Sequence, residues 1–188
     1  MNSMKKPVIG LLIMMFMTIV LGTSCSQKYG DHRGVLSIRQ NLDDYEAYTT
    51  AYEEQINFEL SSEEIENMSL PLNIATIYNT TFSITELAKK NDSITMKIGL
   101  KYNYQSPEGR MLSLFHLNDD NTYTSSGDII KVFDDTGQKV AVSRGSGDGK
   151  KYGYEQWISV KIPKDLITNN EKLSFSISGI NVLSYKEK

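Results

Sequence analysis

A twelve-residue stretch, Ser93–Tyr104, constrains the fold more than any other part of this 188-residue chain. Every second position in it is apolar, in the order Ile94, Met96, Ile98, Leu100, Tyr102 and Tyr104. A period of two places all of these side chains on one face of a strand, whereas a helix would scatter them around its circumference. The stretch therefore predicts a long strand of an antiparallel sheet, with one face covered by a second layer and the other open to water.

Shorter alternating segments continue this pattern along the rest of the chain. We expect strands over 74–78, 81–87, 111–117, 128–133, 139–143, 156–162 and 172–179. Asp134–Gly137 has the composition of a hairpin turn, and a change of apolar parity at Gly179 predicts a bulge. About seven to nine short strands are typical of a sandwich or a barrel. We predict an all-β fold, an immunoglobulin-like antiparallel β-sandwich that spans residues 35–188 as a single domain.

The beginning of this domain has a mixed pattern. Val35–Gln40 is a weak candidate for a first strand. Over Asn41–Ile56 the apolar residues recur at spacings of three and four, which favours a helix, although Tyr48–Ala51 within it is rich in Thr and Tyr and would suit a strand. Ser61 and Glu64 have the spacing of a capping box, so a short helix should cover about 62–67.

The chain starts with a segment that is typical of a secretory leader. Lys5 and Lys6 precede the apolar run Val8–Leu21, and small residues lead to Cys25, which is the only cysteine. A membrane-spanning helix needs roughly 20 apolar residues, so this run is too short to be a good one. We predict that residues 1–24 are a signal peptide and that residues 25–34 are a tether.

The placement of Cys25 resembles the lipobox of bacterial lipoproteins, in which the cysteine receives a diacylglyceryl group and becomes the mature N-terminus. The resemblance implies a lipid anchor on Cys25 and a membrane as its partner. The alternative is ordinary cleavage that leaves a free N-terminal cysteine. The leader, the tyrosine-rich strands and the size resemble the small β-sandwich lipoproteins of unknown function of Bacteroides-type bacteria. That resemblance implies a cell-envelope location at the outer membrane, on the periplasmic or the surface side.

The charge balance argues against some partners. Without Lys5 and Lys6, the 20 basic residues fall to 18 against 23 acidic ones, which gives a net charge of −5. Nucleic acid is therefore not expected as a partner. No cofactor is expected either. The glycine-rich segment Arg144–Lys151 lacks both the first glycine and the Ser or Thr of a phosphate-binding P-loop, so it should be an ordinary loop.

One oxygen-rich segment could suit calcium, and it contains Asn118, Asp119, Asp120, Asn121 and, further on, Asp128. It lacks the glycine and the final glutamate of an EF-hand loop. We favour a solvated turn and keep Asp119, Asp120 and Asp128 as weak candidates for a metal site.

Three aromatic residues, Tyr152, Tyr154 and Trp157, are the best candidates for ligand binding. The alternation of Ile158, Val160 and Ile162 defines the inward face of their strand and leaves Trp157 outward. An outward tryptophan beside two tyrosines can stack on a sugar ring or anchor a protein partner. The alternative is that Trp157 lies beneath a covering loop.

The chain shows no recognisable catalytic constellation, and His32 and His116 are too few for a zinc site. Asp92-Ser93-Ile94 resembles the short motif that receives O-glycans in Bacteroides-type envelope proteins, and a turn before a strand explains it equally well. We expect no enzyme but a membrane-anchored binding module for a glycan or a protein. The alternatives are a structural or assembly component whose strand edges recruit partner strands, and a hydrolase whose residues the sequence does not reveal.

Overall fold

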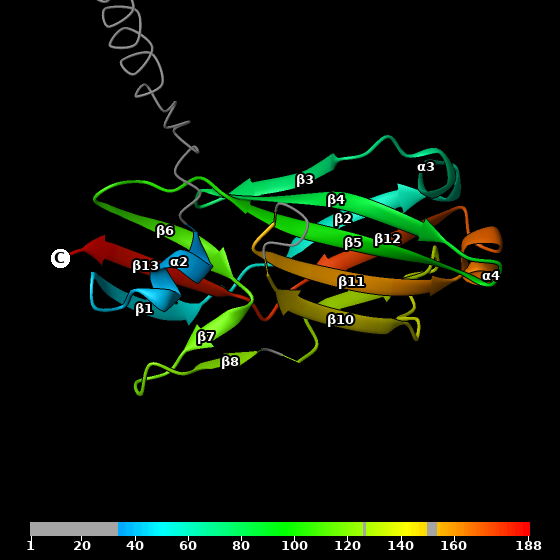
Figure 1. Cartoon of the computed structure of the whole chain (residues 1–188). Coiled ribbons are helices and arrows are strands. Elements are labelled where there is room, and N and C mark those ends of the chain that lie inside the picture. The colour runs from blue at the N-terminus through cyan, green and yellow to red at the C-terminus, as the bar shows by residue number, and fades with distance from the viewer. Residues whose placement is uncertain (1–33, 126, 150–153) are drawn as a thin grey trace, which may run out of the picture. The chain divides into compact units, whose positions relative to one another are not determined.

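The computed structural model describes residues 34–125, 127–149 and 154–188, and antiparallel strands dominate these residues (Figure 1). The predicted all-β class is confirmed, while the immunoglobulin-like identity stays a prediction. The largest sheet has five strands in the order β10-β11-β5-β4-β3. Their bounds are β3 (Leu72–Ile77), β4 (Thr80–Lys89), β5 (Ser93–Tyr102), β10 (Ser143–Asp148) and β11 (Gln156–Pro163).

A three-stranded sheet faces this five-stranded sheet across the main core, and its order is β2 (Ile56–Ser61), β12 (Lys172–Ile177) and β9 (Ile130–Phe133). Figure 1 shows β2 and β12 behind β4, β5 and β11. The period-two residues of β5 lie in this core, and Met96 and Ile98 pair in register with Val160 and Ile158 of β11. Burying one such side chain stabilises the fold by roughly 1.5–3 kcal/mol. The alternation of the sequence is therefore the reason that β5 lies in the middle of the sandwich.

A third sheet, β1 (Tyr45–Ala51), β13 (Asn181–Glu187) and β6 (Glu108–Ser113), has a core of its own beneath helix α2 (Val35–Gln40). One face of this helix joins that core, since Val35 and Ile38 pack on the buried rings of Tyr45 and Tyr185. The Tyr185 hydroxyl donates to the carbonyl of Gln105 at 2.9 Å, which satisfies a polar group that is buried among apolar ones. The two short strands β7 (Phe115–Leu117) and β8 (Tyr123–Ser125) form a separate hairpin.

Two predictions for the start of the domain are wrong. Val35–Gln40 is helix α2 rather than a strand, because the spacing of Val35 and Ile38 lets one face of a short helix pack on the third sheet. The expected helix over Asn41–Ile56 is absent: turns lead into β1, which pairs residue by residue with β13. The strand alternative over Tyr48–Ala51 is therefore the correct one.

The other helices show what local signals can and cannot predict. Helix α3 (Ser62–Asn67) is confirmed, with Ser61 and Glu64 forming the predicted capping box. Helix α4 (Lys164–Thr168) was not expected from the sequence. Among the described residues, no helix combines the length and the apolar character needed to cross a membrane.

Several connections also differ from expectation. Gly179, at φ +69°, is not a bulge but lies in the link through which the chain leaves β12 for β13 in another sheet, and this change of sheet shifts the apolar parity. Most of the glycine-rich segment expected as a loop belongs to β10. The expected strand 111–117 is divided between β6 and β7. The turn at Asp134–Gly137 is confirmed, with Gly137 at φ +81°, but the strand expected over 139–143 is reduced to a single bridge between Phe133 and Lys139.

Candidate ligand-binding site

Trp157 lies on the outer face of the five-stranded sheet, as the alternation predicted. Its strand neighbours Ile158, Val160 and Ile162 are buried in the core, and Trp157 itself is half-buried. In the register of the sheet, Trp157 stands between Gly147 of β10 and Gly99 of β5. It therefore has no side chain directly beside it in this row of the sheet.

The Nε1-bearing side of the Trp157 indole lies against Gly147. A Cβ atom placed on that glycine would be 2.7 Å from Cζ2 and 2.9 Å from Cε2 of Trp157, which is closer than real side chains approach. Only a glycine leaves room for the ring to rest on the backbone here. This contact contributes to the half-buried state of the ring.

Tyr154, in turn, rests on Gly99. A Cβ atom on Gly99 would lie 2.5 Å from Cγ, 2.6 Å from Cδ1 and 2.9 Å from Cδ2 of Tyr154, so one face of the phenol ring covers the glycine. We call Tyr154 and Trp157, with Gly99 and Gly147 beneath them, the aromatic platform. The sequence did not single out these glycines; the available signal was a glycine at an outward strand position beside an aromatic residue.

The polar atoms of the two rings differ in their surroundings: Nε1 of Trp157 lies on the side of the indole that faces Gly147, 3.3 Å from the position of a Cβ atom there. Within the described part of the chain, no residue accepts a hydrogen bond from the Tyr154 hydroxyl or from Nε1 of Trp157. Each ring thus combines an apolar face with a donor at its edge.

An ion pair borders the platform. Lys97 Nζ lies 2.9 Å from Glu86 Oε2 and 5.8 Å from the centre of the Trp157 ring, a distance that suits a cation–π contact. Only 17% of the Lys97 side chain is exposed. The opposite charges of Lys97 and Glu86 cancel, so this border has polar groups without a net charge.

A shallow cleft of about 280 Å³ opens beside Tyr154, and its lining consists of Leu70, Pro71, Thr85, Glu86 and Tyr154. Leu70 is 40% exposed, which is high for so apolar a side chain. The cleft extends the apolar surface of the platform and ends at the carboxylate of Glu86. No signal in the sequence connected Leu70 or Pro71 with this site.

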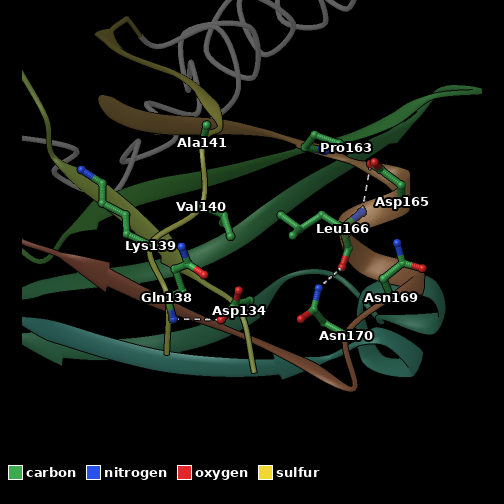
Figure 2. Close-up of a pocket in the computed structure, with 10 residues that line it drawn as sticks. All are labelled: Asp134, Gln138, Lys139, Val140, Ala141, Pro163, Asp165, Leu166, Asn169 and Asn170. Atoms are coloured by element: carbon green, nitrogen blue, oxygen red, sulfur yellow. Dashed lines mark hydrogen bonds between the residues drawn. The ribbon is translucent and has the colours of Figure 1, made fainter. Parts of the chain in front are cut away.

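Another cleft, of about 420 Å³, lies between the turn after β9 and helix α4 (Figure 2). Its carboxylate Asp134 accepts hydrogen bonds from Thr136 and from the backbone of Gln138, and these bonds lower the pKa of Asp134. Asn170 donates to the carbonyl of Leu166 in the same cleft. These polar groups stabilise a turn and the end of a helix, which leaves fewer of them for a ligand.

The weak metal candidates do not converge in the structure. Asp120 accepts hydrogen bonds from Thr122, and Asp128 lies 3.0 Å from the guanidinium of Arg144. Across the described ranges, no three His, Cys, Asp or Glu side chains form a group that could hold a metal ion.

Other predicted residues have structural roles or lie outside the described residues. His116 Nδ1 is 2.9 Å from the hydroxyl of Thr49. Ser93 is only 2% exposed and its hydroxyl donates to Asp92 at 2.9 Å, which favours the turn over the O-glycan motif. Cys25, His32 and Tyr152 lie outside the described residues.

Five carboxyl groups of the described residues share a downward shift of their pKa. Hydrogen bonds to the charged form lower the pKa of Glu59, Glu64, Asp92, Asp120 and Asp134. None of these five is held protonated at neutral pH, which a general acid would require. For Tyr102, burial and the charge of Glu155 raise the pKa well above its usual value and keep the phenol neutral.

No protein-family model matches the chain, and no curated protein or solved structure matches it.

Proposed function

We propose that this chain is a lipid-anchored, non-enzymatic binding module of a bacterial cell envelope, and that its aromatic platform binds a glycan. The observation that carries the proposal is the way Tyr154 and Trp157 rest on Gly99 and Gly147. The Tyr154 ring covers Gly99 and the Nε1-bearing side of the Trp157 ring contacts Gly147, so both rings are held in place before a ligand arrives. The C–H face of a sugar can stack on such a surface at little entropic cost, because the rings are already ordered.

The surroundings of the platform favour a neutral glycan. The charges of Lys97 and Glu86 cancel, and both side chains can exchange hydrogen bonds with sugar hydroxyls. The Tyr154 hydroxyl and the Trp157 indole N–H add two donors at the ring edges. Leu70 and Pro71 offer an apolar wall for a further ring of a glycan chain.

The fluorescence of Trp157 provides a direct test, because it is the only tryptophan of the chain. The full chain is titrated with neutral hexasaccharides of glucose, xylose, mannose and galactose. We expect at least one of them to change the emission, and Trp157→Phe or Tyr154→Ala to weaken its binding by calorimetry about tenfold. Lys161→Ala is the matched control, since this exposed residue lies on the same face of the same strand.

Two results would contradict the glycan proposal. One is the absence of any emission change with all four neutral hexasaccharides. The other is a binding constant that Tyr154→Ala and Lys161→Ala change to the same extent.

The anchor is tested separately on Cys25. Expression in a lipidating Gram-negative host should give a mass that begins at residue 25 and includes acyl chains, with partition into detergent. Cys25→Ala should abolish both properties. A soluble, unlipidated wild-type chain would refute the anchor and leave the platform proposal unaffected.

A role as an assembly component is the second candidate, and the edge strand β3 favours it. Leu72 lies on this strand, and Leu70 and Tyr78 flank it; these are three of the four exposed large hydrophobic side chains among the described residues. The strand carries no charge that would keep a partner strand away. If β3 recruits a strand, Leu72→Lys should abolish self-association in sedimentation equilibrium; a wild-type monomer at every concentration would contradict self-assembly.

A further inference from the structure

A second group of aromatic side chains lies on the third sheet, on the face opposite the core beneath α2. We call Tyr48, Tyr52, Tyr78 and Arg110 the tyrosine face. The register places Tyr48 of β1 opposite Ser184 of β13, and Ser184 opposite Arg110 of β6. Residues opposite each other in a sheet share a face, so Tyr48 and Arg110 stand on the same side, about 10 Å apart across two strand spacings.

The remaining two tyrosines join this row through Arg110. Its guanidinium carbon lies 4.3 Å from the centre of the Tyr78 ring, a stacking distance. The Tyr52 ring meets Tyr78 edge-on, with 6.2 Å between ring centres and 84° between planes. The side-chain amide of Asn79 donates to the carbonyl of Arg110 at 3.4 Å and connects the β3–β4 turn to β6.

Two of these rings are unusually accessible. Tyr48 is 63% exposed and Tyr78 is 38% exposed. Tyr78 also has a left-handed backbone conformation, φ +43°, in the turn between β3 and β4. That conformation is unfavourable for a bulky side chain, and such strain concentrates at binding sites. Asn79 beside it has φ +59°, so the two-residue turn between β3 and β4 itself requires this conformation, and it presents the Tyr78 ring to Arg110.

Two basic residues of this face, Lys186 and Arg110, differ in the acidic residues that stand beside them. Lys186 stands in register between two carboxylates, Glu46 and Glu108. Arg110 stands opposite the neutral Ser184, and it forms no ion pair with any residue of the described ranges. The Arg110 guanidinium therefore lies against an exposed aromatic ring without a direct ion pair to a described residue, while the carboxylate of Glu54 on this face accepts a hydrogen bond from Tyr52.

We infer that the tyrosine face binds a glycan that carries carboxylate groups. Stacking on Tyr78 occupies one plane of the Arg110 guanidinium and leaves its N–H edge free to bind a carboxylate in two parallel hydrogen bonds. The exposed rings of Tyr48 and Tyr78 then contact the apolar faces of the sugar. This site is distinct from the aromatic platform, because Tyr48 and Arg110 belong to the third sheet and none of its residues is part of the platform.

Calorimetry with two matched probes tests the inference on the full chain. One probe is a hexamer of galacturonic acid, and the other is the same hexamer after reduction of its carboxyl groups to alcohols. We expect the acidic hexamer to bind, and its affinity to fall as the salt concentration rises. The reduced hexamer should bind at least tenfold more weakly than the acidic one at the same salt concentration. Arg110→Gln should lower the affinity for the acidic hexamer about tenfold or more, and Arg110→Lys should restore only part of it.

Lys186→Gln is the matched control, since it removes the same charge from the same face at a position flanked by two carboxylates. We expect it to change the affinity by less than about threefold. Trp157 emission is recorded in parallel, and we expect no change, because Trp157 lies in the platform. Melting curves of both variants show that they fold.

Four outcomes would overturn the inference: no binding of the acidic hexamer, equal binding of the reduced hexamer, equal effects of Arg110→Gln and Lys186→Gln, or a change in Trp157 emission on binding. The last would assign the acidic glycan to the platform. A failure here leaves the neutral-glycan proposal intact, because that proposal depends on other probes and other variants.

Discussion

Two sheet faces of this protein carry exposed or half-exposed aromatic side chains, and they support those side chains differently. On the five-stranded sheet, the rings of Tyr154 and Trp157 rest against the backbone of two glycines. On the third sheet, Tyr48 is largely exposed, and Tyr78 is held by stacking with Arg110 and by an unfavourable turn. The rings of the aromatic platform are supported by backbone, because the glycines beneath them have no side chain. The Tyr78 ring of the tyrosine face is supported by its contact with another side chain, that of Arg110.

This difference has consequences for what each face can bind. Rings that lie on backbone have one orientation, and the ion pair beside them leaves no net charge. The tyrosine face has more freedom at Tyr48 and one cation without a direct ion pair to a described residue. Preorganised stacking suits a neutral ligand, whereas an unpaired guanidinium suits a carboxylate.

The largest effect in this comparison is expected for Gly99→Val. The valine side chain would collide with the Tyr154 ring and force the ring off the sheet. We expect the free energy of unfolding to fall by about 1–3 kcal/mol, and glycan binding at the platform to be lost. Ser184→Val, at a half-buried position of the other sheet, should cost less than about 0.5 kcal/mol. Urea unfolding measures both; equal losses would show that Gly99 does not support the ring.

A smaller effect is expected for Gly147→Ala. A methyl group there would lift the indole of Trp157, but β10 is an edge strand that can yield, so the loss of stability should stay below about 1 kcal/mol. The emission maximum of Trp157 should shift to longer wavelength, because the ring loses its contact with the backbone. Gly145→Ala, whose new Cβ atom would be 4.0 Å from the Trp157 ring, is the control. A similar shift in both variants would show that the position of the Trp157 ring does not depend on its contact with Gly147.

On the tyrosine face, Tyr78→Asn separates binding from folding. Asparagine accepts the left-handed conformation of this turn, so the lost ring contacts are offset by relieved strain, and stability should change by less than about 1 kcal/mol. Binding of the acidic hexamer should nevertheless fall about tenfold. Thermal unfolding and calorimetry measure the two quantities; unchanged binding would remove Tyr78 from the site.

The smallest effect concerns the ionisation of Tyr52. Burial raises its pKa, and the charge of Glu54 and the hydrogen bond to it, 3.2 Å long, raise it further. Because the pKa is higher in the folded chain, the resulting stabilisation is present at neutral pH and is lost as the pH rises through the alkaline range. Glu54→Gln should lower the Tyr52 pKa in an NMR titration of the ring carbons. An unchanged pKa would exclude Glu54 as a contributor.

Much of the body of the fold could be predicted from local pattern. The alternation of β5 and β11 identified their buried residues, and the Ser61–Glu64 capping box identified helix α3. Outward placement of Trp157 followed from the same alternation. These signals work because a strand has two faces and a helix start has few ways to satisfy its first N–H groups.

The start of the domain could not be predicted in this way. Val35–Gln40 is short and β-rich in composition, but it folds as a helix because its apolar face fills a space on the third sheet. Asn41–Ile56 has helical spacing, but backbone pairing with β13 makes its central part a strand. Over such short segments local preferences amount to about 1 kcal/mol, so long-range contacts decide.

By itself, the sequence determined the all-β class, the inward and outward faces of the central strands, the capped helix α3 and the candidacy of Tyr154 and Trp157. Only the tertiary structure decided that glycines carry those two rings, that Leu70 and Pro71 border them, and that Arg110 and Tyr78 meet beside Tyr48. These residues are far apart along the chain. Their contacts depend on strand order and register, which a local pattern of apolar and polar residues does not encode.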